Sequence, residues 1–238
     1  MRLHWATYCD RGLARDRNQD AVWAGEGLLG VADGFGPSTD AAMPSAAALE
    51  ALAGSAKVTS AGALLDALRV AAEQAAAAVQ AMTASGTGLE GAGTTLTALA
   101  WAGSDLALVH VGDSRAYLLR DGLLLQLTHD DTYTQRLVDE GKLTAEEARS
   151  HPQRMLLTRA LHAGSDALPE IRAHAAQAGD RYLLASDGLH VPVRPSAIKR
   201  VLTENAEPDI AVTRLAELVH SAGAPDNVVC VVADILVA

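Results

Sequence analysis

The clearest pattern in the sequence is a set of four short apolar runs that each border an aspartate. In each, consecutive aliphatic residues lie next to Asp-Gly, Gly-Asp or Asp-Asn. Apolar runs of this length, bounded by glycine and polar residues, predict buried strands. Four unrelated turns are one explanation, and a single site at a shared sheet edge is the other. The aspartates are Asp33, Asp113, Asp187 and Asp226.

The remaining hydrophobic pattern predicts a mixed fold. We expect strands over residues 3–8, 21–24, 28–32, 94–102, 106–112, 115–120, 123–128, 171–176, 181–186 and 227–237. We expect helices over residues 38–53, 60–82, 132–140, 144–150, 195–203 and 208–222, with Asp40 as a candidate cap of the first. Asp121-Gly122 predicts a hairpin, and Thr144 with Glu147 predicts a capping box. Alternating βαβ units are absent from this order, which favours an α+β fold with antiparallel sheets covered by helices.

Composition and net charge limit the kinds of protein and binding partner that fit this sequence. The chain has 238 residues, of which 49% are hydrophobic, so one large domain with a substantial core is feasible. Its net charge is −10, and it has no run of lysine or arginine, which argues against nucleic acid or an anionic membrane as the main partner. The first residues lack a signal-peptide pattern, and no membrane-spanning apolar stretch occurs, so we expect a soluble, cytoplasmic monomer.

The two cysteines do not have metal-site spacing. Cys9 and Cys230 each fall inside a predicted strand, so we expect buried thiols, with a disulfide between them left open. Aspartate carboxylates, and the peptide carbonyl that Gly34 exposes after Asp33, are oxygen donors. Hard divalent cations such as Mg²⁺ and Mn²⁺ prefer such donors.

Six short motifs occur in order along the chain. They are Arg15–Asp20 (RDRNQD), Ala32-Asp33-Gly34, Gly93-Thr94-Thr95, Gly112-Asp113-Ser114-Arg115, Ser186-Asp187-Gly188-Leu189 and Asp226-Asn227. In their order and approximate spacing they resemble the metal-dependent protein phosphatases, the type 2C serine/threonine class, and most of all their bacterial branch. Residues 128–161 also resemble the flap of bacterial members.

This resemblance implies a four-layer α/β/β/α sandwich, in which two central antiparallel sheets are flanked by helices. It implies one catalytic domain over residues 1–238 with a flap at about 131–160. The implied activity is hydrolysis of phosphoserine and phosphothreonine in proteins, opposing a bacterial serine/threonine kinase. Two Mn²⁺ or Mg²⁺ ions would activate water and clamp the phosphoryl oxygens.

The resemblance also implies a role for each site residue. Asp33 would bridge the two metals, and the carbonyl of Gly34 would bind the second. Asp187 and Asp226 would complete the first metal, and Asp113 with Asp187 would hold a third, weaker ion. In the catalytic set with Asp33, Arg15 would bind the substrate phosphate and Asp20 would orient metal-bound water.

Three positions depart from the family pattern. Phe35 stands where eukaryotic members often have histidine, so another group must protonate the leaving oxygen. Gln19 replaces a common glutamate and removes a negative charge near the second metal. Met155 occupies a flap position where some relatives have an oxygen-bearing residue.

Other interpretations stay open. Arg15 is also explained as a loop charge, Asp20 as a turn cap, and Asp113 as a structural partner of Ser114 or Arg115. The whole chain is also explained as a pseudophosphatase that acts as a regulatory binding module, or as a phosphatase of small esters. Backbone-packing roles are expected of Thr94 and Thr95, and surface or packing roles of His129, His151, His162 and His190.

Overall fold

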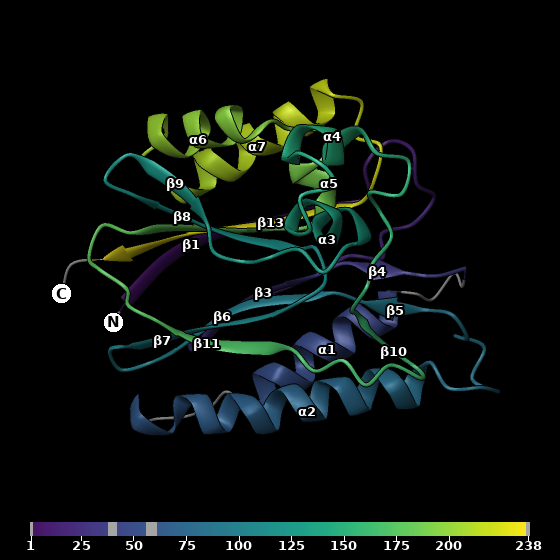
Figure 1. Ribbon diagram of the computed structural model, residues 1–238. Coiled ribbons are helices and arrows are strands. Elements are labelled where there is room, and N and C mark those ends of the chain that lie inside the picture. Colours follow the sequence, from purple (N-terminus) through teal and green to yellow (C-terminus); the bar gives the residue numbers. More distant parts are fainter. Residues whose placement is uncertain (1, 38–41, 56–60, 237–238) are drawn as a thin grey trace.

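Two five-stranded antiparallel sheets are stacked at the centre of the molecule, as the computed structural model shows for residues 2–37, 42–55 and 61–236 (Figure 1). The first sheet contains, in order, β1 (Arg2–Asp10), β13 (Val228–Leu236), β12 (Arg181–Ala185), β8 (Arg115–Arg120) and β9 (Leu123–Gln126). The second contains β11 (Glu170–His174), β7 (Asp105–Val111), β6 (Leu96–Ala102), β3 (Leu28–Ala32) and β2 (Ala21–Gly25).

Helices cover both outer faces. The helices α1 (Ala42–Ser55) and α2 (Leu64–Met82) pack on the second sheet. The short 3₁₀ helix η1 (Ala61–Ala63) directly precedes α2. The helices α5 (Asp187–His190), α6 (Pro195–Glu204) and α7 (Pro208–Ser221) lie over the first sheet (Figure 1). The predicted α/β/β/α sandwich is therefore confirmed.

The alternation of side chains along the strands separates three apolar layers. In β13, Val229 and Val231 point between the sheets, whereas Val228 and Cys230 point toward the outer helices. Both faces of the central strands are thus buried. This explains why the sequences of these strands are continuous runs of apolar residues rather than alternating ones. Gly30 of β3 lets α1 approach closely, because a Cβ there would lie 2.7 Å from Leu49 Cδ2.

The segment predicted to be a flap, residues 131–160, lies at one end of the sandwich. It contains α3 (Tyr133–Asp139) and α4 (Ala145–Ser150), within a residue or two of the predicted helices. The capping box of Thr144 and Glu147 is confirmed, since each side chain bonds the backbone N–H of the other residue. A small sheet of β10 (Leu161–His162), β5 (Gly93–Thr94) and β4 (Gly34–Phe35) lies at the same end.

Most predicted elements are confirmed, and the differences have physical causes. The hairpin at Asp121-Gly122 is present, and both residues have positive φ, 51° and 72°. The two-residue strands of the small sheet and the four-residue α5 were not predicted, because elements this short show no periodicity. The candidate cap Asp40 lies outside the described residues.

The prediction of two buried thiols is wrong for Cys9. Cys230 is buried in the central strand β13, but Cys9 is exposed, and both are free. Cys9 belongs to β1, an edge strand, where the Asn18 side-chain amide donates to its sulfur at 3.1 Å.

Candidate active site

Asp33 directly follows β3 and is fixed through its backbone. Its N–H donates to Thr95 Oγ1 at 3.0 Å, and the N–H of Thr95 donates to the Asp33 carbonyl at 2.9 Å. Thr95 Oγ1 also hydrogen bonds Ser114 Oγ at 2.7 Å. Thr95 therefore positions Asp33 beside the segment that carries Asp113, which is more than the packing role that we expected for it.

Asp187 is the first residue of α5, after β12. A Cβ on Gly188 would lie 1.8 Å from the carbonyl oxygen of Asn227, so α5 presses against the chain that enters β13. Only glycine permits this approach. It brings Asp187 next to Asp226, and burial, followed by the negative charge of Asp226, raises the pKa of Asp187.

Ser186 connects the start of β13 to the loop before β2. Its Oγ donates to Asp20 Oδ2 at 2.8 Å and accepts the Val229 N–H at 3.1 Å. Asp20 is buried, so its carboxylate is held at the site end of the sheets rather than at the surface. A turn-cap role alone does not account for this contact.

Asn227 organises the loop that carries Arg15. Its Nδ2 donates to the carbonyls of Arg11 and Arg17, both at 2.8 Å, and its Oδ1 accepts the Gln19 N–H at 2.9 Å. No function of Asn227 was predicted from its position in the sequence. A buried amide that bonds three backbone groups of one loop is a positioning device.

Arg15 contacts a predicted metal ligand in this structure. Its Nη2 lies 2.7 Å from Asp226 Oδ2, while half of the arginine side chain, 51%, remains exposed. The guanidinium therefore lies at the mouth of the site and faces its carboxylates, where it also lies within electrostatic range of Asp187 and Asp33.

Asp113 lies in the turn between β7 and β8. The preceding Gly112 has φ 105°, and its N–H donates to Asp131 Oδ2 at 2.9 Å, which ties the turn to the start of the flap. His190 of α5 donates from Nε2 to the Asp113 carbonyl at 2.9 Å. Burial lowers the pKa of His190 to about 3, so its ring is neutral and links the Asp113 turn to α5.

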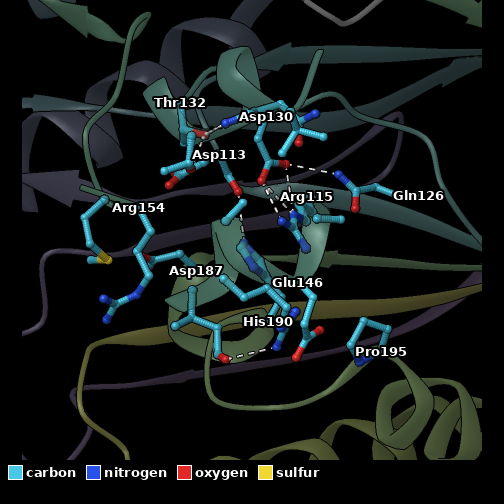
Figure 2. A pocket seen from close by; sticks show the side chains of 18 of the residues that line it. Asp113, Arg115, Gln126, Asp130, Thr132, Glu146, Arg154, Asp187, His190 and Pro195 are labelled. Carbon is cyan, nitrogen blue, oxygen red and sulfur yellow. Dashed lines mark hydrogen bonds and ion pairs between the residues drawn. The ribbon is translucent and has the colours of Figure 1, made fainter. Parts of the chain in front are cut away.

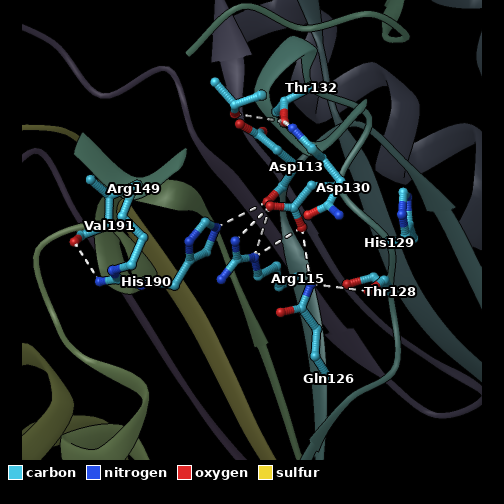
Figure 3. A network of polar contacts seen from close by, with 12 residues as sticks. Asp113, Arg115, Gln126, Thr128, His129, Asp130, Thr132, Arg149, His190 and Val191 are labelled. Atoms are coloured by element: carbon cyan, nitrogen blue, oxygen red, sulfur yellow. Dashed lines mark hydrogen bonds and ion pairs between the residues drawn. The ribbon is translucent and has the colours of Figure 1, made fainter. Parts of the chain in front are cut away.

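A polar network lies beside Asp113 (Figure 3). Arg115 binds both carboxylate oxygens of Asp130, with Nη2 to Oδ2 at 2.6 Å, and donates to Tyr117 Oη at 3.1 Å. Gln126 donates from Nε2 to Asp130 Oδ1 and to the Thr128 carbonyl, both at 3.0 Å. This bidentate, nearly buried pair anchors the residue just before the flap to the first sheet.

The carboxylates at this end of the sandwich strongly influence one another. Burial raises the pKa of Asp20 to about 7 and that of Asp187 to about 6, and neighbouring carboxylates raise both. Burial, followed by the charges of neighbouring aspartates, raises the pKa values of Asp33 and Asp113 well above the usual range. Such a group of acids in close proximity is the electrostatic environment that a divalent cation relieves.

The donor set fits a hard cation. It consists of carboxylates and the carbonyl of buried Gly34, without a thiol or imidazole ligand. In the described part of the chain, no three His, Cys, Asp or Glu side chains already surround one ion position. Asp226 Oδ2 instead contacts Arg15 Nη2 at 2.7 Å, and Asp226 would exchange that contact for an ion shared with Asp33 and Asp187.

The predicted aspartates meet at one end of the fold, although they are far apart in sequence. Asp33 lies within electrostatic range of Asp20, Asp187 and Asp113, and Asp226 lies within range of Asp187. Sequence reasoning missed the side chains that hold them in place. Those side chains are Thr95, Ser114, Ser186, His190 and Asn227.

A four-layer sandwich with clustered aspartates at one end of its sheets defines the class of metal-dependent phosphatases. The chain belongs to the protein phosphatase 2C family, whose sequence profile matches residues 13–233.

Curated relatives support this membership. The chain is 48% identical over 236 residues to the serine/threonine protein phosphatase PstP of Mycobacterium tuberculosis, covering 98% of this chain and 45% of PstP. It therefore spans about half of that relative's length. It is 32% identical over 245 residues to the serine/threonine phosphatase stp of Listeria monocytogenes, covering 95% of this chain and 93% of stp.

Two solved structures of similar fold are also serine/threonine phosphatases. The catalytic domain of PstP in complex with two manganese ions superposes with a TM-score of 0.91 at 45% identity, covering 99% of both chains. The Staphylococcus aureus serine/threonine phosphatase Stp1 has a TM-score of 0.91 at 26% identity, covering 99% of this chain and 96% of the other. Within the described residues, none of the helices combines the length and apolar character needed to span a bilayer.

Proposed function

We propose that this chain is a metal-dependent serine/threonine protein phosphatase that hydrolyses phosphoserine and phosphothreonine monoesters in proteins and opposes a serine/threonine kinase. The observation that carries the proposal is the cluster of Asp20, Asp33, Asp113 and Asp187 at one end of the sandwich. The overall similarity of the chain to the catalytic domain of PstP in complex with two manganese ions, at a TM-score of 0.91 and 45% identity, supports it.

Asp33, Asp187 and Asp226 would hold Mn²⁺ or Mg²⁺, with the carbonyl of Gly34 as a further donor. When bound, the two ions supply a water of lowered pKa and neutralise the phosphoryl oxygens. A third, weaker ion would be held by Asp113 together with Asp187.

The chain's own groups do the remaining work. Arg15 exchanges its contact with Asp226 for the substrate phosphate, to which a guanidinium can donate two parallel hydrogen bonds. Asp20, whose Oδ2 accepts from Ser186, orients the attacking water. Residues 131–160 act as a flap on the single catalytic domain and contribute to the choice of substrate.

The pseudophosphatase alternative is disfavoured. A binding module has no need of a complete carboxylate set, and this chain keeps Asp33, Asp187 and Asp226 together with the loop contacts of Asn227.

The test is hydrolysis of a phosphothreonine peptide with Mn²⁺, with Mg²⁺ and with chelator. Asp187→Asn should abolish the metal-dependent rate, because it removes one carboxylate charge from the ligand set. Asp105→Asn, an exposed change at the start of β7, is the matched control and should retain the rate. A folded wild-type protein without metal-dependent turnover would favour the binding module.

A further inference from the structure

A cavity of about 440 Å³ adjoins the aspartate cluster (Figure 2). Asp113 and Asp187 border it on the site side, and it continues between the flap and the start of α6. Its position means that a peptide whose phosphorylated residue occupies the site can place a neighbouring side chain in the cavity.

The cavity concentrates arginine in an acidic protein. Arg149, Arg154 and Arg194 line it, coming from α4, from the segment after α4 and from the residue before α6. A fourth arginine, Arg115, is already neutralised by Asp130. Apart from the aspartates of the site, the remaining acid is Glu146. Outside the site aspartates and the Arg115–Asp130 pair, the lining therefore carries three arginines and one acid, an excess of positive charge in a chain of net charge −10.

These guanidinium groups are available to a ligand. The side chains of Arg154 and Arg194 make no hydrogen bond or ion pair within the described part of the chain, and both residues are exposed. Arg149 has only a long contact, 3.4 Å from Nη2 to the Val191 carbonyl. None of the three has to break an ion pair before it binds an anion.

The start of α6 adds to the positive field. Arg194 is its N-cap residue and Pro195 its first helical residue, and no side chain caps the helix. Both residues, with Ser196, line the cavity, so the positive end of the ten-residue helix faces the same space as the guanidinium groups.

We propose that this cavity is a subsite for a second anionic group of the phosphorylated substrate, either a carboxylate or a second phosphate near the scissile phosphoserine or phosphothreonine. Arg194 and Arg149 are the specificity-determining residues. The inference rests on the proposed phosphatase activity and names the substrates that the enzyme prefers. Guanidinium suits both ligands, because its donors match paired oxygens.

The experiment compares three peptides that carry the same phosphothreonine. One has neutral neighbours, one has glutamates three to five residues away, and one has a non-hydrolysable phosphonate at those positions. For the wild-type protein, kcat/KM for the two anionic peptides should exceed that for the neutral peptide by about tenfold, mainly through KM. The preference should shrink in added salt, since exposed charges are screened. The two anionic peptides separate carboxylate from phosphate recognition.

Arg194→Gln and Arg149→Gln should each remove most of the preference and leave hydrolysis of the neutral peptide and of p-nitrophenyl phosphate in place. Arg194→Glu should reverse the preference. Arg69→Gln, on α2 and paired with Asp66, is the matched control and should keep it.

Equal kcat/KM for all three peptides in the wild type would overturn the subsite while leaving the phosphatase intact. A preference that survives in both arginine variants would overturn it as well. If no peptide is hydrolysed, the proposed function fails, and fluorescence anisotropy of the labelled peptides still decides the subsite. In that case tighter binding of the anionic peptides, lost in Arg194→Gln, supports it, and equal binding refutes it.

Discussion

Asn227→Ala should loosen the loop of residues 11–20 and destabilise the whole domain. The Asn227 side chain joins that loop to the start of β13 through bonds to Arg11, Arg17 and Gln19. The same loop carries Arg15 and Asp20, so the substitution acts on the candidate active site without removing any group that we assign to it.

The expected magnitude follows from these contacts. The substitution removes three hydrogen bonds of 2.8, 2.8 and 2.9 Å from a side chain that is 5% exposed. At a net value of about 1 kcal/mol each, the loss is about 3 kcal/mol. Water at the exposed loop can replace some of the lost bonds, so we expect about 2–3 kcal/mol. Asn227→Asp should cost at least as much, because a carboxylate oxygen would then face two carbonyl oxygens.

Urea unfolding of the metal-free protein measures this change as a shift of the midpoint at constant slope. Hydrolysis of a phosphothreonine peptide should fall in parallel. Asn205→Ala is the matched control, because the Asn205 side chain bonds the Val201 carbonyl four residues earlier, at the end of α6. It should cost about 1 kcal/mol and retain the hydrolysis rate. An Asn227→Ala protein within about 0.5 kcal/mol of wild type would refute the reasoning.

Three further changes test the site. Gly188→Ala should lower the free energy of unfolding, measured by thermal unfolding, by more than about 3 kcal/mol, because its Cβ would lie 1.8 Å from a carbonyl oxygen of the segment before β13. Gly54→Ala is the control and should be tolerated, because its Cβ would meet nothing within 4 Å. In metal-free protein, the stability advantage of wild type over Asp20→Asn should fall as pH rises from about 4 to 7 in urea titrations. The reason is that the Asp20 pKa is raised from 3.8 to about 7 in the folded state, so over this range the folded protein retains a proton that the unfolded chain has released. A stability advantage that rises with pH would contradict this expectation. His190→Ala should lower the free energy of unfolding, measured in urea, by about 1–3 kcal/mol, because it leaves the Asp113 carbonyl without its donor. His190→Gln keeps a donor and should lower it less, and equal losses would exclude this hydrogen bond as the cause.

The sequence was most informative where local rules operate. Asp121-Gly122 defined a hairpin because both residues readily adopt the positive φ that its turn requires. Thr144 and Glu147 defined a helix start because their bonds span only three residues. The strand ends at Asp33 and Asp187 were visible for the same reason, since an apolar run followed by a turn residue is a local signal.

Long-range contacts were not visible in the sequence. The bond of Ser186 to Asp20 joins positions 166 residues apart, and that of Asn227 to Arg11 joins positions 216 apart. Serine and asparagine at these positions have no periodic or compositional signature that distinguishes them from ordinary turn residues. Cys9 was placed wrongly for a related reason, because a strand pattern does not tell an edge strand from a central one.

By itself the sequence determined the longer strands and helices, the aspartates at the strand ends and, through six motifs in order, the family. Those properties depend on periodicity, turn chemistry and residue identity along the chain. Only the tertiary structure decided that Asp33, Asp113 and Asp187 share one end of the sandwich, where burial raises their pKa values. It also decided that Arg15 contacts Asp226 and that three arginines face one cavity. These properties depend on distances between residues remote in sequence, and packing of the two sheets sets those distances.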